Sequence, residues 1–249
     1  MTTLLLALAA GAVVGLALGG LGGGGSMLAV PALVYLLDFS PARATTASLV
    51  IVAVTSLTGL LAHARAGRVR WRTGVLFAAA GLPAAAAAGA LSTHLPGTLL
   101  TGTFALLTAL AAWRMLMPPK KGQQKRSASG PARSTATGAG LGAVTGLLGV
   151  GGGFLAVPAL VSVLAFTMAE AVGTSLLVIT TNSLAALLPR LGAAGAVDWA
   201  MAAPFTGAAI LGAWDGKRLA DKLSGRTLQR AFAVALLGVA ALMLITTLN

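Results

Sequence analysis

Long stretches of this chain carry almost no charge, and this feature constrains its fold more than any other. Residues 44–62 and 73–91 contain no Asp, Glu, Lys or Arg, and residues 99–116 and 228–248 contain one arginine each. Runs of about 18 or more apolar residues are typical of membrane-spanning helices. Charged residues make up 9% of the chain, against about 25% in a soluble domain. The sequence therefore predicts an all-α polytopic membrane protein.

Several functional classes are disfavoured by the same composition. The formal net charge is +12, but the basic residues cluster between apolar runs, as the positive-inside rule expects, and do not indicate nucleic-acid binding. The chain has no cysteine, and its two histidines, His63 and His94, lie far apart, so no disulfide framework or metal site is expected. No paired carboxylates or nucleophile–base pair occur in the spans. We expect no enzyme, cofactor or metal, and a lipid bilayer as partner.

Two similar halves flank a polar segment. Residues 28–34 and 155–161 share the sequence LAVPALV, and Ser48-Leu49 matches Ser175-Leu176 at the same offset. Agreement at separated points in the same order indicates an internal repeat. The segment between the halves is basic and rich in Gly, Ser and Pro, as linkers are. The predicted division is a first transmembrane repeat at 1–117, a basic linker at 118–135 and a second repeat at 136–249.

Arginine and lysine also predict the orientation. Residues 63–72 carry four arginines and residues 118–134 carry five basic residues, so both segments are expected to be cytoplasmic. The basic segment of the second half, 215–226, aligns with residues 92–97, which contain no Lys or Arg. Equivalent loops then lie on opposite sides, the repeats are inverted, and both termini are periplasmic. Inverted repeats are a signature of secondary transporters, which bind substrate near the centre of the membrane where the repeats meet.

Each half begins with an apolar stretch that is interrupted by glycines. The sequences GLGGGGSMLAVPALV, ending at Val34, and GLLGVGGGFLAVPALV, ending at Val161, both place a proline after the break. The two apolar pieces of the second stretch are each about 20 Å long as helices, short of the ~30 Å hydrocarbon core. We expect re-entrant helical hairpins at 4–37 and 137–165, each followed by three transmembrane helices. Two tilted full spans are an alternative at 4–37.

The glycine breaks are candidate anion sites. A helix that restarts near Ser26 presents unpaired amides and the positive end of its dipole, which bind anions without a buried cation. The second break supplies a matching helix N-terminus. The alternative is that the glycines only allow tight helix packing. The candidate substrate-binding residues at the breaks are Gly23, Gly24, Gly25, Ser26, Gly151, Gly152, Gly153 and Phe154.

Polar residues in the spans that follow the hairpins add to these candidates. Ser48 and Thr55 lie on one helical face, and Ser175 and Asn182 occupy the equivalent positions. Hydroxyl and amide groups donate hydrogen bonds to an oxyanion without the desolvation cost of a buried charge. Alternatively, the hydroxyls bond the carbonyls of their own helix. Arg43, His63 and Arg190 are candidates for gating or anion attraction, with interfacial anchoring as the alternative.

The motifs together resemble those of a known family. A glycine-rich turn precedes LAVPALV in both halves, GTSLLVI follows at 173–179, and G-x-V-x-W occurs at 67–71 and 195–199. This set resembles the sulfite exporter TauE/SafE family, which includes 4-toluene sulfonate uptake permease-like transporters. The first copy departs from the pattern, with Thr46 and Ala47 where the second has Gly173 and Thr174.

The resemblance implies a bacterial inner-membrane transporter of sulfur-containing anions. We therefore expect a secondary transporter that exports sulfite or an organosulfonate such as sulfoacetate. The substrate is held at mid-membrane between the repeats by helix N-terminal amides and Ser and Asn side chains. A passive anion channel that uses the same site, or a permease for another small anion, is the alternative.

Overall fold

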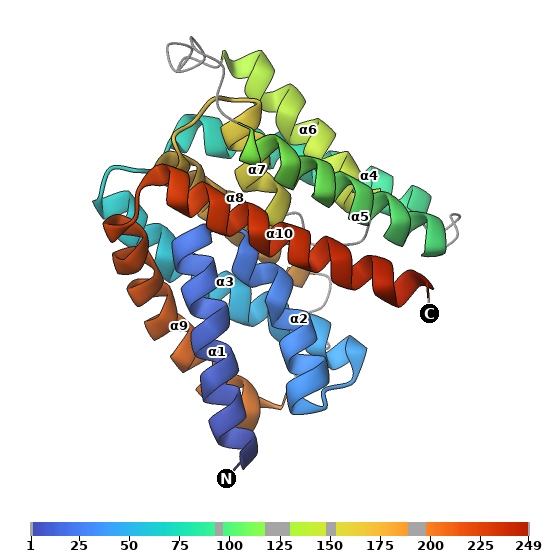
Figure 1. Cartoon of the computed structure of the whole chain (residues 1–249). Helices are drawn as coiled ribbons and strands as arrows, with labels where there is room; N and C mark the ends of the chain where they lie inside the picture. Colours follow the sequence, from blue (N-terminus) through green and yellow to red (C-terminus); the bar gives the residue numbers. More distant parts are fainter. Residues whose placement is uncertain (1, 93–96, 118–129, 148–152, 189–197, 249) are drawn as a thin grey trace.

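The computed structural model describes residues 2–92, 97–117, 130–147, 153–188 and 198–248. Every regular element within these residues is a helix (Figure 1). The helices are α1 (Thr2–Leu21), α2 (Gly24–Leu37), α3 (Pro41–Arg65), α4 (Trp71–Ser92), α5 (Gly97–Leu116), α6 (Pro131–Leu147), α7 (Gly153–Ser162), α8 (Met168–Leu187), α9 (Trp199–Lys222) and α10 (Gly225–Leu248). Three helices are long and apolar enough to cross a membrane, at Thr3–Leu21, Arg43–Arg65 and Met168–Leu187. The polytopic helical class predicted from the sequence agrees with this fold.

Two of the predicted loops are largely helical. α3 continues to Arg65 and α4 begins at Trp71, so the segment 63–72 contains a connection only at 66–70. In the second half, residues 215–222 are the last two turns of α9. Asp215, in the segment 215–226 that we expected to be a loop, is therefore a helix residue. The predicted ends of these helices were wrong because charged side chains occur both at helix termini and in loops.

The first glycine break is shorter than predicted. α1 continues to Leu21, and α2 begins at Gly24 instead of near Ser26. The chain reverses at Gly22, whose φ is +75°, a conformation that glycine adopts without the steric cost of a Cβ atom. A Cβ atom on Gly25 would collide with Leu18 of α1. Gly25 thus allows α2 to pack closely against α1, which is the packing alternative considered for these glycines.

The arms of the two hairpins differ in length. α1 has 20 residues and α7 has 10. At 1.5 Å per residue, α1 is about 30 Å long, which matches the hydrocarbon core, whereas α7 reaches about half of that depth. Pro31 and Pro158 lie inside α2 and α7, where each removes one backbone hydrogen bond of the helix. A full span is therefore possible for α1, and a partial one for α7.

The second helices of the two hairpins end in the same way. Asp38 and Ala165 both have left-handed backbones, with φ of 55° and 56°. The next residue in each case, Phe39 or Phe166, donates its N–H to the carbonyl six residues earlier. These pairs keep the sequence offset of the LAVPALV repeat. Local structure is thus repeated along with sequence.

Glycines line two seams that connect the halves. On α1 and α6, a Cβ atom at any of five glycines would collide with a backbone oxygen of α9 or α4. Residue numbers rise together along both helices of each seam, so α1 runs parallel to α9 and α6 parallel to α4. Each half therefore contributes its first helix to a seam with the other half, and the halves interlock. The five glycines are Gly11, Gly15 and Gly19 on α1 and Gly138 and Gly142 on α6.

α3 and α8 cross between the two seams and run antiparallel. The Thr180 hydroxyl donates to the Ser56 hydroxyl at 2.9 Å, and one turn further along α3, Gly59 lies against Leu176 of α8. α3 also contacts α9, and α8 also contacts α4. α5 and α10 pack on each other across the bundle (Figure 1). About half or more of each of α3 and α8 is thus buried inside the protein.

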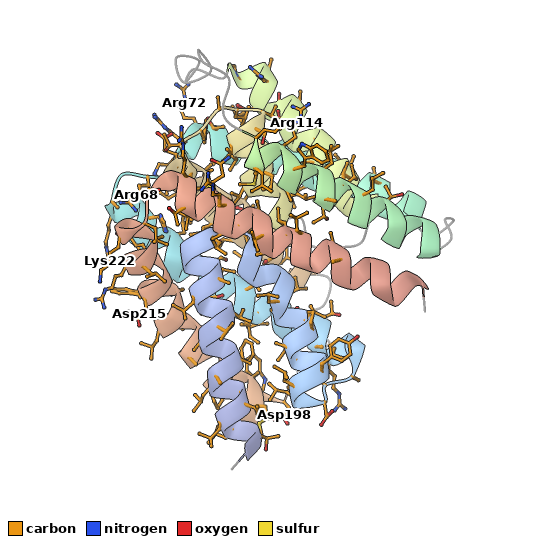
Figure 2. All side chains as sticks on the ribbon, in the orientation of Figure 1. Arg68, Arg72, Arg114, Asp198, Asp215 and Lys222 are labelled. Atoms are coloured by element: carbon orange, nitrogen blue, oxygen red, sulfur yellow. The ribbon has the colours of Figure 1, made fainter. Side chains whose placement is uncertain are left out.

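Basic residues gather at one end of the bundle, which we call the basic end. Arg68, just after α3, forms an ion pair with Asp221 near the end of α9. Figure 2 shows Arg68 and Lys222 at this end and Asp198 at the far end of α9. The start of α1 and the end of α10 point away from it (Figure 1). Among the basic residues that the structure describes, only Arg43 lies at the opposite end. The predicted basic segments 63–72 and 215–226 therefore lie on the same side.

Candidate functional site

The turn between α1 and α2 contacts the second half of the chain. A Cβ atom on Gly22 would lie 2.5 Å from Ser175 Oγ and 3.1 Å from Val157 Cγ2. Just before the turn, the carbonyl oxygen of Gly19 is 3.2 Å from His63 Nε2. We call Gly19, Gly22, His63 and Ser175 the tip cluster. It unites a glycine break with two side chains that the sequence analysis selected separately.

The tip cluster lies closer to the basic end than to the middle of the bundle. His63 is two residues before the last residue of α3, and Ser175 is in the second turn of α8. The turn lies near the basic end because α1 is nearly as long as α3. We expected this turn at mid-membrane as the break of a re-entrant hairpin, with two tilted full spans at 4–37 as the alternative.

The hydroxyl groups selected from the sequence bond to their own helices. Ser175 donates to the Val172 carbonyl at 2.8 Å, and Ser48 and Thr55 donate to carbonyls of α3 at 2.8 and 2.6 Å. All three side chains are buried. These bonds are the local alternative considered above. Ser175 differs from the other two in that its oxygen also faces the glycine turn.

Asn182 does not join the tip cluster. Its side chain lines a small enclosed space with Phe77, Gly138 and Leu141 at the seam between α4 and α6. The amide oxygen Oδ1 is buried and has no hydrogen-bond partner. A buried carbonyl oxygen without a donor is costly, so this position favours a water molecule or another donor. The same helix α8 thus carries two polar positions that face different neighbours.

The N-terminus of α2 supplies backbone donors beside the tip cluster. Its N-cap residue is Gly23, which has no side chain that could cap the helix. The N-cap residue therefore offers no side-chain acceptor to the first amides of the helix, at Gly24, Gly25 and Ser26. In an apolar environment such amides favour an anionic partner.

The second glycine break is only partly described. Gly153 is buried and begins α7, and Phe154 lies in the first turn of that helix. Gly151, Gly152 and Arg190 lie outside the described residues. Arg43 is exposed in the first turn of α3, at the end opposite the basic end.

An ionic layer covers the tip cluster at the basic end, and the sequence analysis missed it. Arg70 donates from Nε to Glu170 Oε1 at 2.9 Å, and its backbone N–H donates to Thr174 Oγ1 at 3.1 Å. Arg68 pairs with Asp221, which also accepts from Lys217 at 2.8 Å. These contacts attach residues 66–70 to α8 and α9. The pairs across the halves are separated by 100 or more residues, so no local pattern indicates them.

A local sequence pattern indicates the position of one residue of the ionic layer, Glu170. Thr167 and Glu170 form a capping box at the start of α8, in which each side chain bonds the backbone of the other. The pattern Thr-x-x-Glu before an apolar run indicates such a cap. It locates Glu170 at a helix start but does not reveal its partner Arg70.

Comparison with known proteins places the chain in a family. Residues 7–243 match the family described as "Sulfite exporter TauE/SafE". The chain belongs to the TauE/SafE family. A "Probable membrane transporter protein" of Xylella fastidiosa (strain 9a5c) is 34% identical over 245 residues, which cover 96% of this chain and 94% of that protein. The "Probable membrane transporter protein YunE" of Bacillus subtilis (strain 168) is 25% identical over 224 residues, 80% of each chain. No solved structure matches the chain significantly.

Membership of the TauE/SafE family confirms the resemblance drawn from the glycine turns and the LAVPALV repeats. Together with the helical fold, it identifies a multi-pass membrane protein of the transporter type. The family match covers both halves of the chain and therefore both glycine-interrupted stretches.

Proposed function

We propose that this TauE/SafE protein is a secondary transporter that exports a small sulfur-containing anion, either sulfite or an organosulfonate such as sulfoacetate, across the bacterial inner membrane. The family description supports sulfite as a substrate. The contact between Gly22 and Ser175 carries the proposal. It brings the turn that precedes α2 and a buried hydroxyl from the other half to one place.

The anion is bound by neutral donors. The first amides of α2 and the Ser175 hydroxyl donate to the oxyanion, and the hydroxyl rotates away from the Val172 carbonyl, to which it now donates at 2.8 Å. Neutral donors retain the anion without the strong attraction of a buried ion pair. Gly22 and Ser175 are in contact in this conformation, so binding requires the turn and α8 to separate.

Inverted repeats are the second part of the proposal. α3 and α8 occupy equivalent positions in the two halves and run antiparallel where they cross. Equivalent left-handed residues also end α2 and α7. These observations support two repeats of opposite topology, with boundaries at 1–117 and 136–249.

The moving bodies in alternating access differ from the two halves of the sequence. The glycine seams bring backbone against backbone between α1 and α9 and between α4 and α6. Such close contacts resist sliding. We therefore assign α1, α2, α3 and α9 to one body and α4, α6, α7 and α8 to the other. The bodies meet at α3 and α8, and the ionic layer closes the basic end between them.

Substrate binding tests the site. Thermal-shift measurements with sulfite, sulfate, thiosulfate and small sulfonates are expected to select one or more stabilising anions. Ser175→Ala is expected to weaken binding of these anions at least about tenfold, the effect of losing one hydrogen bond to a charged group. Thr206→Val is the matched control, because Thr206 also donates to its own helix, at 2.6 Å, but lies on α9. Equal affinities in wild type and Ser175→Ala contradict the proposed site.

A passive channel with the same site is distinguished in liposomes. A secondary transporter exchanges labelled for unlabelled anion and accumulates label in counterflow, whereas a channel does not concentrate its substrate. Counterflow of the anion selected by thermal shift is therefore expected. Flux without counterflow favours the channel.

The basic end is expected to face the cytoplasm, with both termini in the periplasm. The chain has no cysteine, so single cysteines report accessibility without interference. Ala66→Cys, in the exposed connection after α3, is expected to resist an impermeant thiol reagent added to intact cells. Ser40→Cys, exposed before α3 at the opposite end, is expected to react. The reverse pattern contradicts this orientation.

A further inference from the structure

One side chain of the tip cluster has a buried nitrogen without a partner. His63 is 1% exposed, and its Nε2 lies 3.2 Å from the carbonyl oxygen of Gly19. A carbonyl only accepts hydrogen bonds, so Nε2 carries the hydrogen and Nδ1 of the neutral ring is an acceptor. Nδ1 is buried and has no hydrogen-bond partner. Polar groups in this situation are uncommon and call for an explanation.

Charged side chains of α9 and of the connection after α3 lie near His63. Lys217 and Asp221 of α9 and Arg68 of the following connection interact with the ring electrostatically. Arg68 and Lys217 both bind Asp221, which leaves this group of three with one net positive charge. Uncharged residues of α1 and α8 also contact His63, among them Gly19 and Gly173. Glu170, at the start of α8, is already paired with Arg70.

An anion bound at the tip cluster offsets the net positive charge near His63. Ser175 and Gly22 lie in the same cluster as His63, and Gly19 is three residues before the turn. A negative charge there compensates a protonated imidazole at short range, in an environment where electrostatic interactions are poorly screened. Nδ1 is then the group best placed to receive a proton.

We propose that His63 is a proton-binding residue of this transporter and takes up a proton when an anion occupies the tip cluster. This inference rests on the proposed anion site. The proton comes from water at the basic end and adds to the lone pair of Nδ1. The Nε2 hydrogen bond to Gly19 is kept, no covalent bond breaks, and the proton returns to water when the anion leaves. By linkage, the proton raises the affinity for the anion by the same factor by which the anion raises the affinity for the proton.

Nuclear magnetic resonance of the imidazole tests the inference directly. The chain has two histidines, so His94→Gln leaves His63 as the one histidine signal. With 15N-labelled imidazole, we expect a neutral ring at about pH 7 in the empty protein and an imidazolium signal in saturating sulfite or sulfoacetate. Sulfoacetate keeps both of its charges between about pH 6 and pH 8, because sulfonates and carboxylates ionise at lower pH. Any change is then due to the protein.

A non-titrating variant supplies the second measurement. His63→Gln retains an N–H donor for the Gly19 carbonyl but binds no proton. In the parent protein, sulfoacetate affinity is expected to fall by up to about tenfold per pH unit as the pH rises. In His63→Gln, the affinity is expected to be independent of pH. Transport by the parent is expected to carry protons with the anion, and transport by the variant is not.

The outcomes separate this inference from the proposed function. If the anions stabilise the protein thermally but leave the His63 signal unchanged, or if His63→Gln keeps the pH dependence, proton binding at His63 is overturned and the anion site stands. If no anion alters either the thermal stability or the signal, both fail. If His63→Gln does not fold, the signal in the His94→Gln protein decides alone.

Discussion

Gly15→Leu is expected to prevent α1 from packing on α9 and to abolish the folded, monodisperse protein. A Cβ atom at this position would collide with the backbone oxygen of Ala209, and the backbone of a helix has no alternative rotamer. Overpacking a well-packed core costs about 1–3 kcal/mol when side chains can adjust, and this contact exceeds that range because two helices must separate. Size-exclusion profiles and thermal unfolding of the purified protein measure the effect.

Gly207→Leu is the matched control for this substitution. Gly207 lies on α9 itself, but no atom lies near enough to contact an added Cβ. A leucine there is expected to leave the size-exclusion profile unchanged, since it points into open space and leucine favours helices over glycine by roughly 1 kcal/mol. Equal behaviour of the two variants would show that the α1–α9 seam does not hold the bundle together.

Gly22→Ala is expected to have the second large effect, on anion binding. Alanine in the left-handed conformation costs about 1–2 kcal/mol, and the added methyl group would lie 2.5 Å from Ser175 Oγ and 3.3 Å from Val172 Cα. The turn must then shift away from α8, which moves the α2 amides relative to the Ser175 hydroxyl. We expect the affinity for the selected anion to fall more than about tenfold, measured by thermal shift or calorimetry.

Gly67→Ala separates backbone strain from the contact. Gly67 also has a left-handed φ, +68°, but nothing lies within 4 Å of an added Cβ. It is expected to lower stability by the conformational cost alone and to leave anion affinity unchanged. If both variants bind the anion with similar affinity, the contact between the turn and α8 is not part of the binding site.

The proposed grouping of the helices into two bodies also predicts which ion pair separates during transport. In the proposed alternating access α9 moves together with α1, so we expect opening of the basic end to break contacts at residues 66–70, which bind both α8 and α9. Arg68 pairs with Asp221 within the body that contains α9, whereas Arg70 pairs with Glu170 in the body that contains α8. We therefore expect the proposed opening to separate the Arg70–Glu170 pair.

The sequence by itself determined the class of protein, the bounds of its simplest helices and its family. Hydropathy located α3, α4 and α5 to within about three residues, since solubility in lipid depends on local composition. The clustering of arginine predicted which segments share a side, and the contact between Arg68 and Asp221 agrees with it. The LAVPALV repeat indicated two related halves, and the TauE/SafE match covers both.

The roles of individual polar and glycine residues were decided only by the tertiary structure. Gly15 and Gly207 both lie inside helices, yet a Cβ atom on Gly15 would collide with α9 and one on Gly207 would contact nothing. Ser175 and Asn182 lie on one helix, but Ser175 faces the glycine turn and Asn182 faces the α4–α6 seam. These differences depend on how helices far apart in sequence cross, and neither hydropathy nor periodicity contains that information. The same reason applies to Arg70 and Glu170, whose partnership exists only because α8 begins where α3 ends.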